Sequence, residues 1–179
     1  LENEFFNGFG TCTNFDRKRL ARELALVKKL DSTHPVIISR SDNYAGFSLR
    51  HPLPDLVGIS IYRRVWDAQI SHRYAEYPFP SWYYGFLAGT QKIELQAEPW
   101  PPNGKNIIDI TLAEQNKSFD AKQLAKRVKF AKNSGVKSID LWGAEYWYYR
   151  STILHDPSVW TAAKQVFSNT SLNIYVAIH

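Results

Sequence analysis

The chain has 179 residues, enough for one domain with a sizeable core, and its 44% hydrophobic and 22% charged residues are typical of a globular protein. The net charge of +5 comes with no nucleic-acid recognition motif, so the basic residues are interpreted as solvated helix faces. No apolar run approaches the roughly 20 residues that a membrane-spanning helix needs. The single cysteine, Cys12, excludes an internal disulfide and leaves both secreted and cytoplasmic locations open.

Strand-like and helix-like segments alternate along the chain. A helix capped by Thr13 or Asn14 is predicted to reach about Leu30. One stripe of it is apolar and expected to be buried, with Lys and Arg opposite, and consists of Leu20, Leu24, Val27 and Leu30. Asp156 and Pro157 form the cap and first position of a later helix. Buried strands are predicted at 35–39, 55–62, 93–98 and 136–143, and further helices at 81–88 and 118–133.

Strands that alternate with helices favour parallel βαβ units and an α/β fold. With a strand stub at 2–4, the predicted strands fit strands four to eight of a (β/α)8 TIM barrel, and a full barrel needs ~250 residues. We therefore expect residues 1–179 to be the C-terminal portion of one barrel domain. The absence of Met, including at position 1, also suggests a fragment or a processed product.

Two glutamates stand where the predicted strands end. Glu4 follows Asn3 at the start of the chain, and Glu98 is followed by Pro99 and Trp100. In a (β/α)8 barrel the active site lies at the C-terminal ends of the strands. A pair of carboxylates at that edge is what glycosidic bond hydrolysis requires.

The order of these residues resembles the C-terminal half of a clan A glycoside hydrolase of the cellulase-like family 5 type. That clan has Asn-Glu at the end of strand four, a second Glu after strand seven, and commonly a Tyr and a Trp at the ends of strands six and eight. Asn3-Glu4, Tyr62, Glu98 and Trp142 stand in those places. The first half of the barrel, with the Arg and His that such enzymes carry on strands two and three, has no counterpart in the chain.

The resemblance implies a retaining hydrolase for β-linked glycans. Glu98 would be the nucleophile and Glu4 the acid/base. Asn3 would bind the sugar 2-hydroxyl, Tyr62 would orient Glu98, and Trp142 would form the floor of the sugar subsite. No cofactor or metal is implied.

Other aromatic and acidic residues near the strand ends are weaker candidates. Trp100 and Trp147, with Tyr146 and Tyr148, either line a cleft for an extended glycan or cover the top of the barrel. Glu145 is the fallback nucleophile if the assignment of strand seven is wrong. Tyr62 and Trp142 also have a plain packing interpretation.

The expected partners are an oligosaccharide or polysaccharide substrate and either the N-terminal half of the barrel or a second copy of the chain, with no nucleic acid and no membrane span. The alternative function is a catalytically silent, barrel-derived carbohydrate-binding protein. A (β/α)8 enzyme for proton abstraction is a third hypothesis. It is disfavoured because no Lys and no metal-binding acidic cluster stands at the strand ends.

Overall fold

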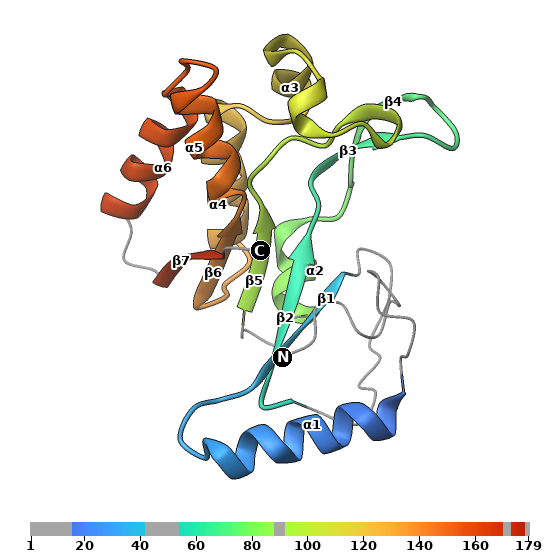
Figure 1. Cartoon of the computed structure of the whole chain (residues 1–179), viewed down its shortest axis with the longest axis vertical. Helices are drawn as coiled ribbons and strands as arrows, with labels where there is room; N and C mark the ends of the chain where they lie inside the picture. Colours follow the sequence, from blue (N-terminus) through green and yellow to red (C-terminus); the bar gives the residue numbers. More distant parts are fainter. Residues whose placement is uncertain (1–15, 42–53, 88–91, 170–172, 178–179) are drawn as a thin grey trace.

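The computed structural model describes residues 16–41, 54–87, 92–169 and 173–177. These residues form an α/β fold built on a five-stranded parallel sheet with the order β1-β2-β5-β6-β7 (Figure 1). Neighbouring strands in the sheet follow one another along the chain, as parallel strands joined by crossover helices do. The strands of this sheet are β1 (Ile37–Ser41), β2 (Leu56–Ile61), β5 (Lys92–Gln96), β6 (Ser138–Trp142) and β7 (Asn173–Ala177).

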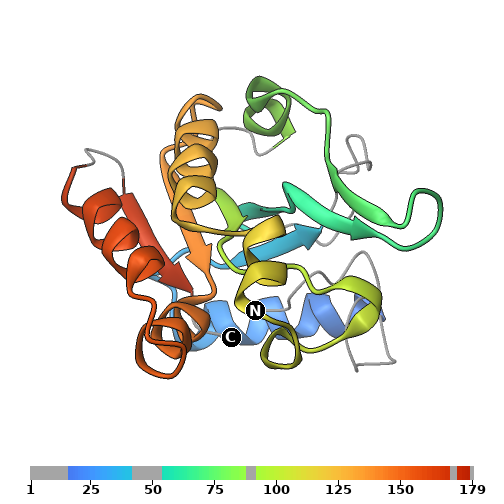
Figure 2. The ribbon, with the colours of Figure 1, turned by 90° about the horizontal axis from the view of Figure 1, so that it is seen from above.

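Seen from above, α4 and α6 lie next to each other on one side of the strands, and α1 lies on another (Figure 2). The helices are α1 (Arg17–Leu30), α2 (Ser81–Leu87), α3 (Leu112–Ser118), α4 (Ala121–Lys132), α5 (Ala144–Thr152) and α6 (Ser158–Ser168). Short 3-10 turns occupy Pro102–Gly104 and Ile107–Asp109. A parallel sheet with helical crossovers confirms the predicted α/β class.

The four predicted strands are present, with boundaries shifted by one to two residues, but several expectations for the helices were wrong. The cap of α6 is Pro157 rather than Asp156, and Ser158 is its first residue. The cap of α1 is Asp16, whose carboxylate accepts the amide of Lys18 at 2.9 Å, rather than Thr13 or Asn14. Leu30 is 78% exposed and does not join the buried stripe of α1. The helix expected at 118–133 is α4, which begins at Ala121 because Asp120 caps it through the amide of Gln123. Ser118, the expected first residue, instead ends the separate helix α3.

Five of the described α-helices and strands were not predicted, one of which is α3. A hairpin of β3 (Arg64–Asp67) and β4 (Arg73–Glu76) follows β2, and α5 begins directly after β6. The strand β7 adds to the outer side of β6, with Trp142 opposite Ala177. In the expected numbering β6 is strand eight of a barrel, so β7 occupies the edge at which strand eight would pair with strand one.

One face of the sheet is apolar and covered by helices. The strand residues on it alternate with those on the other face, as the period of a strand requires. The main core joins these strand residues to α2, α4, α5 and α6, and a smaller core joins α1 to β1. The fully buried strand residues of the two cores are Ile38, Ile59, Ile61, Ile93, Leu95, Ile139 and Leu141.

The opposite face of the sheet is polar, although much of it is also buried. In-register rows across β2, β5 and β6 bring Ser60, Glu94 and Asp140 together. Lys92 pairs with Asp140 and lies 3.9 Å from Glu94, and the Ser60 hydroxyl donates to Glu94 at 3.1 Å. Burial raises the pKa of Glu94, while the charge of Lys92 opposes that rise. A parallel sheet that helices cover on both faces is normally apolar on both. This sheet differs from that arrangement because one of its faces is polar.

Candidate functional site

The C-terminal ends of β2, β5 and β6 bring the predicted strand-end residues together. Tyr62 directly follows β2, Glu98 lies just beyond β5, and Trp142 is the last residue of β6. The Tyr62 ring meets the Trp142 ring edge-on at a centroid distance of 5.2 Å and the Trp100 ring at 5.4 Å. These three aromatic side chains and Glu98, hereafter the rim cluster, are the part of the predicted site that the structure assembles.

Glu98 is the acid of the rim cluster and lies in a partly buried position. Its carboxyl pKa is raised to about 7, first by burial and then by the negative charge of Glu145. A hydrogen bond from the Trp142 side chain lowers it in part. Trp142, rather than the predicted Tyr62, therefore donates the hydrogen bond that the structure shows at this carboxylate. Glu98 can bind or release a proton near neutral pH, which is the property of a catalytic acid or base.

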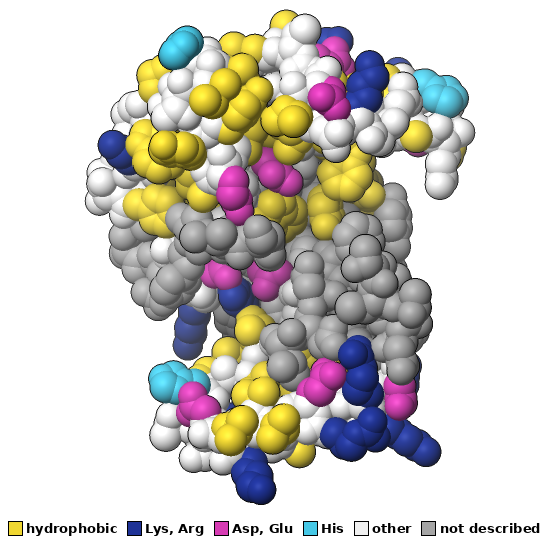
Figure 3. Space-filling view, viewed as in Figure 1, with side chains coloured by type: hydrophobic (Ala, Val, Ile, Leu, Met, Phe, Trp, Pro, Cys, Tyr) yellow, Lys and Arg dark blue, Asp and Glu magenta, His cyan; other side chains and the backbone are white. Residues whose placement is uncertain are grey.

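The rings of the rim cluster differ in exposure. Trp142 is 9% exposed, so it offers little more than an edge to solvent. Tyr62 and Trp100 are half-buried and present more of their surface. In the space-filling view, acidic side chains lie among hydrophobic ones in the upper half of the molecule (Figure 3). Aromatic faces beside a carboxyl group suit a ligand with apolar ring faces and polar edges, such as a sugar.

The backbone immediately before Glu98 is held by two buried side chains. The Trp147 indole donates to the carbonyl oxygen of Ala97 at 2.6 Å, and the Arg127 guanidinium donates to that of Gln96 at 2.8 Å. Arg127 also donates to the carbonyl oxygen of Ser118 at 2.6 Å. Both side chains are 2% exposed. Trp147 was predicted to contact substrate, and this is corrected: its ring is in the core and orients the strand end.

Gly143 lets β6 turn into α5 close to Glu98. Its φ of 110° lies in the region that glycine alone adopts readily. A Cβ at this position would lie 2.9 Å from the carbonyl oxygen of Ala97 and 2.9 Å from the Cβ of Glu98. The close approach of two backbones therefore requires glycine and places the first turn of α5 beside the carboxylate.

The loop after Glu98 is also fixed by hydrogen bonds. The Trp100 amide donates to the Ser118 hydroxyl at 3.0 Å, which holds the Trp100 backbone near α3. The buried Gln115 amide donates to the carbonyl oxygens of Ile107 and Ile110 at 3.1 and 3.2 Å. It accepts the Tyr146 hydroxyl at 2.9 Å, so α5 and this loop are joined. Tyr146 is thus a core residue rather than part of a cleft.

Glu145 is the second carboxylate that the structure places near the rim cluster. It lies in the first turn of α5, is exposed, and raises the pKa of Glu98 by its charge. Three residues along the same helix, Tyr148 is 62% exposed. Glu145 remains the fallback nucleophile of the sequence analysis, with an electrostatic effect on Glu98 as its visible property. The other predicted carboxylate, Glu4, and its neighbour Asn3 lie outside the described residues.

Arg127 and Ser118 hydrogen-bond the backbone on either side of Glu98, and the sequence analysis did not identify them. A signal for Arg127 was present, because it occupies the same face of α4 as the buried Leu124, Val128 and Ala131. A cation on an apolar helix stripe requires buried acceptors. Those acceptors are the carbonyl oxygen of Gln96 at the end of β5 and that of Ser118 at the end of α3.

No group of His, Cys, Asp and Glu that could hold a metal ion occurs within the described residues. Among the helices that the structure describes, none is long and apolar enough to cross a membrane. Comparison with models of protein families, with curated proteins and with solved structures gave no match.

Proposed function

We propose that the chain is the C-terminal part of a (β/α)8 glycoside hydrolase that cleaves β-linked glycans with retention of configuration. The observation that carries the proposal is the rim cluster: a partly buried glutamate with a pKa near 7, hydrogen-bonded by an indole and bordered by two further rings. It lies at the C-terminal ends of parallel strands, where barrel enzymes hold their catalytic groups.

The polar face of the sheet supports the barrel. The side chains of Ser60, Glu94 and Asp140 lie on this face, and in a closed barrel they would point inward. Gln96 is 1% exposed, and its amide has no hydrogen-bond partner among the described residues. Strands on the far side of a barrel would supply one. Closure by an N-terminal half would also require β7 to leave the outer edge of β6.

The proposed reaction uses Glu98 as the nucleophile. Its carboxylate oxygen attacks the anomeric carbon, the glycosidic C–O bond breaks, and the leaving oxygen takes a proton from Glu4. Glu4 then removes a proton from water, whose oxygen displaces the Glu98 carboxylate and regenerates it. With a pKa near 7, Glu98 is ionised and competent in a large fraction of molecules only at neutral pH and above.

A mechanism-based 2-deoxy-2-fluoroglycoside provides the test. We expect it to form a covalent adduct on Glu98 that peptide mass spectrometry locates. Glu98→Ala should lose turnover of an aryl β-glycoside and recover it with azide, giving a glycosyl azide of inverted configuration. Retained configuration would instead make Glu98 the acid/base. An adduct on Glu145 would move the nucleophile to α5.

The second candidate function is carbohydrate binding without hydrolysis. The raised pKa of Glu98 favours it, because a protonated carboxyl group can both donate to and accept from sugar hydroxyls. In that case oligosaccharides should quench tryptophan fluorescence of the wild-type chain, and the fluoroglycoside should label no residue.

A further inference from the structure

The β3–β4 hairpin is held firmly beside the rim cluster. Its first strand begins two residues after Tyr62, and the Arg63 guanidinium donates to the carbonyl oxygens of Tyr77 and Phe79 at 3.0 and 3.2 Å. Arg63 also lies over the Phe130 ring at 4.1 Å. The base of the hairpin is therefore tied to the end of β2 and to α4.

One face of the hairpin is used for attachment. The Trp66 indole donates to the Asn103 side chain at 3.0 Å, in the loop that follows Glu98. The Tyr74 hydroxyl donates to Glu114 on α3 at 3.0 Å, and the Trp66 and Tyr74 rings meet edge-on at 5.2 Å. These contacts fix the hairpin relative to the loop that carries Trp100.

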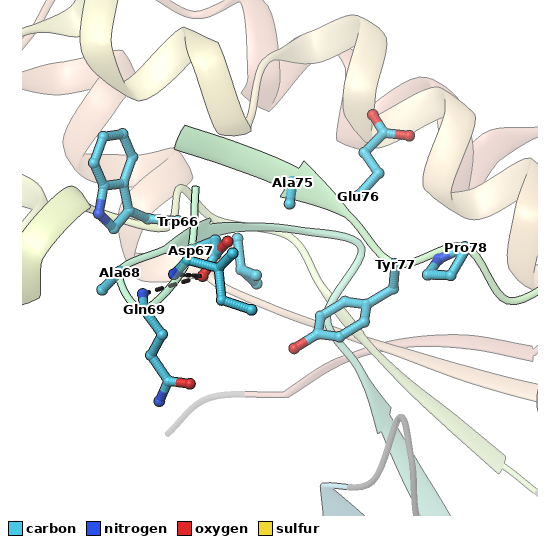
Figure 4. Close-up of a pocket in the computed structure, with 10 residues that line it drawn as sticks. Trp66, Asp67, Ala68, Gln69, Ala75, Glu76, Tyr77 and Pro78 are labelled. Carbon is cyan, nitrogen blue, oxygen red and sulfur yellow. Dashed lines mark hydrogen bonds between the residues drawn. The ribbon is translucent and has the colours of Figure 1, made fainter. Parts of the chain in front are cut away.

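The other face borders a cavity of about 470 Å³, in the size range of small-molecule sites. Val65 and Ala75 are a cross-strand pair that lines it. In Figure 4 the Gln69 and Tyr77 side chains extend to one side of the hairpin and the Trp66 ring to the other. The cavity thus has an apolar cross-strand pair, a phenol ring and an amide among its lining groups.

The charged groups that line the cavity already have partners. The Asp67 carboxylate accepts the amides of Gln69, Ile70 and Ser71, together with the Ser71 hydroxyl, and these bonds hold its pKa well below the usual range. Glu76 pairs with Arg64 at 3.3 Å. Among the residues that the structure describes, no Lys or Arg lines the cavity, so an anionic ligand finds no counter-charge from them. A neutral ligand with an apolar ring face and hydroxyl groups is complementary to it.

We propose that this hairpin cavity is an additional sugar-binding subsite, separate from the rim cluster. Tyr77 stacks on one sugar ring and Gln69 hydrogen-bonds its hydroxyls. The inference rests on the proposed function, because the sugar in the cavity is a distant unit of the same glycan whose bond is cleaved at Glu98. Units bound there lower the barrier only for substrates long enough to reach them.

The test compares substrates of different length in the full chain. Cello-, manno- and xylo-oligosaccharides, from disaccharide to hexasaccharide, are hydrolysed alongside an aryl β-glycoside of one sugar unit. Tyr77→Ala and Gln69→Ala are compared with Arg73→Ala, an exposed position on the same hairpin. Circular dichroism and thermal melting establish that the variants are folded.

We expect Tyr77→Ala to lower kcat/KM for the longest substrates about threefold to tenfold, the value of one aromatic contact. The aryl glycoside and the Arg73→Ala variant should be unaffected. Retention of the full length dependence by both cavity variants overturns the subsite. If the wild-type chain cleaves no substrate, the hydrolase proposal fails separately. The subsite is then decided by fluorescence titration with the hexasaccharides, in which equal affinity of wild type and Tyr77→Ala overturns it.

Discussion

The indole N–H of Trp147 donates at 2.6 Å to the carbonyl oxygen of Ala97, which is the residue immediately before Glu98. Trp147 is on α5 and Ala97 directly follows β5, so a single buried hydrogen bond joins the helix after β6 to the strand end beside the candidate catalytic acid. Its counterpart from α4 is Arg127, which binds the preceding carbonyl. The position of Glu98 thus depends on two elements that follow it in the chain.

Trp147→Phe should lower the free energy of unfolding by about 1–3 kcal/mol, because it leaves the buried Ala97 carbonyl without its partner. The substitution also removes part of the buried indole, so a cavity adds to the cost of the lost hydrogen bond. Thermal and urea unfolding provide the measurement. Trp82→Phe is the matched control, since Trp82 is 65% exposed on α2 and should tolerate the change. Equal stability of the two variants would contradict the assignment.

Arg127→Met should be more destabilising, by about 3 kcal/mol or more, because two buried carbonyl groups lose a charged donor. Burial lowers the pKa of Arg127 to about 9, so the side chain is still a cation at neutral pH. Its exposed neighbour on the same helix, Lys126, serves as the control in the form Lys126→Met. Chemical denaturation of both variants measures the free energy of unfolding. A loss below ~1 kcal/mol for Arg127→Met would argue against a stabilising role of its two hydrogen bonds.

Gly143→Ala should both destabilise the fold and displace Glu98. The new methyl group would lie 2.9 Å from the Ala97 carbonyl oxygen and 2.9 Å from the Glu98 Cβ. Gly104→Ala separates the two effects, because Gly104 has a φ of 68° but no atom within 4 Å of the added Cβ. We expect unfolding experiments to show a backbone cost of about 1 kcal/mol for Gly104→Ala and a clearly larger one for Gly143→Ala.

The raised pKa of Glu98 makes stability depend on pH. The folded state binds this proton up to about pH 7, whereas the unfolded chain releases it near 4.5. The folded state therefore holds more protons between these values, and its stability from this group falls as the pH rises through that window. Glu98→Gln should remove this part of the dependence, measured by urea unfolding at several pH values. If the free energy of unfolding changes across the window by the same amount in wild type and in Glu98→Gln, the pKa shift of Glu98 is refuted.

Glu145→Gln should lower the pKa of Glu98, because it removes the negative charge that helps to raise it. If Glu98 is the nucleophile, the acidic limb of the kcat/KM profile should move to lower pH. Glu23→Gln, at a surface position on α1, is the control. An unchanged acidic limb would show that Glu145 does not act on Glu98, and loss of all turnover would favour Glu145 as the nucleophile.

Lys92→Met should cost about 3–5 kcal/mol, because it leaves Asp140 and Glu94 as buried carboxylates without their cation. The exposed Lys137 gives the control variant Lys137→Met. Adding Asp140→Asn and Glu94→Gln to Lys92→Met should restore part of the loss. Thermal melting of the single and combined variants measures this. Additive losses would mean that the polar face is not one network.

The local patterns of the chain were sufficient to predict the strands β1, β2, β5 and β6, because each lies in a short apolar-rich segment that ends in a turn. The expectation that Tyr62, Glu98 and Trp142 share one edge came from placing them at the C-terminal ends of parallel strands. The parallel register puts these strand ends at one edge of the sheet. Short-range signals were weaker for the hairpin and for β7, where few residues separate one element from the next.

Tertiary structure decided which of these residues face solvent and which support the others. Trp147 and Trp100 both follow the end of a predicted strand. The first is nevertheless a buried donor to Ala97, and the second is a half-buried ring of the rim cluster. Arg127 is one of several basic residues on α4, and only the position of the β5 end gives it acceptors. The physical reason is that secondary structure follows periods of two and 3.6 residues within a segment. Burial, hydrogen-bond partners and the pKa of Glu98 depend on groups distant in sequence, which folding alone brings together.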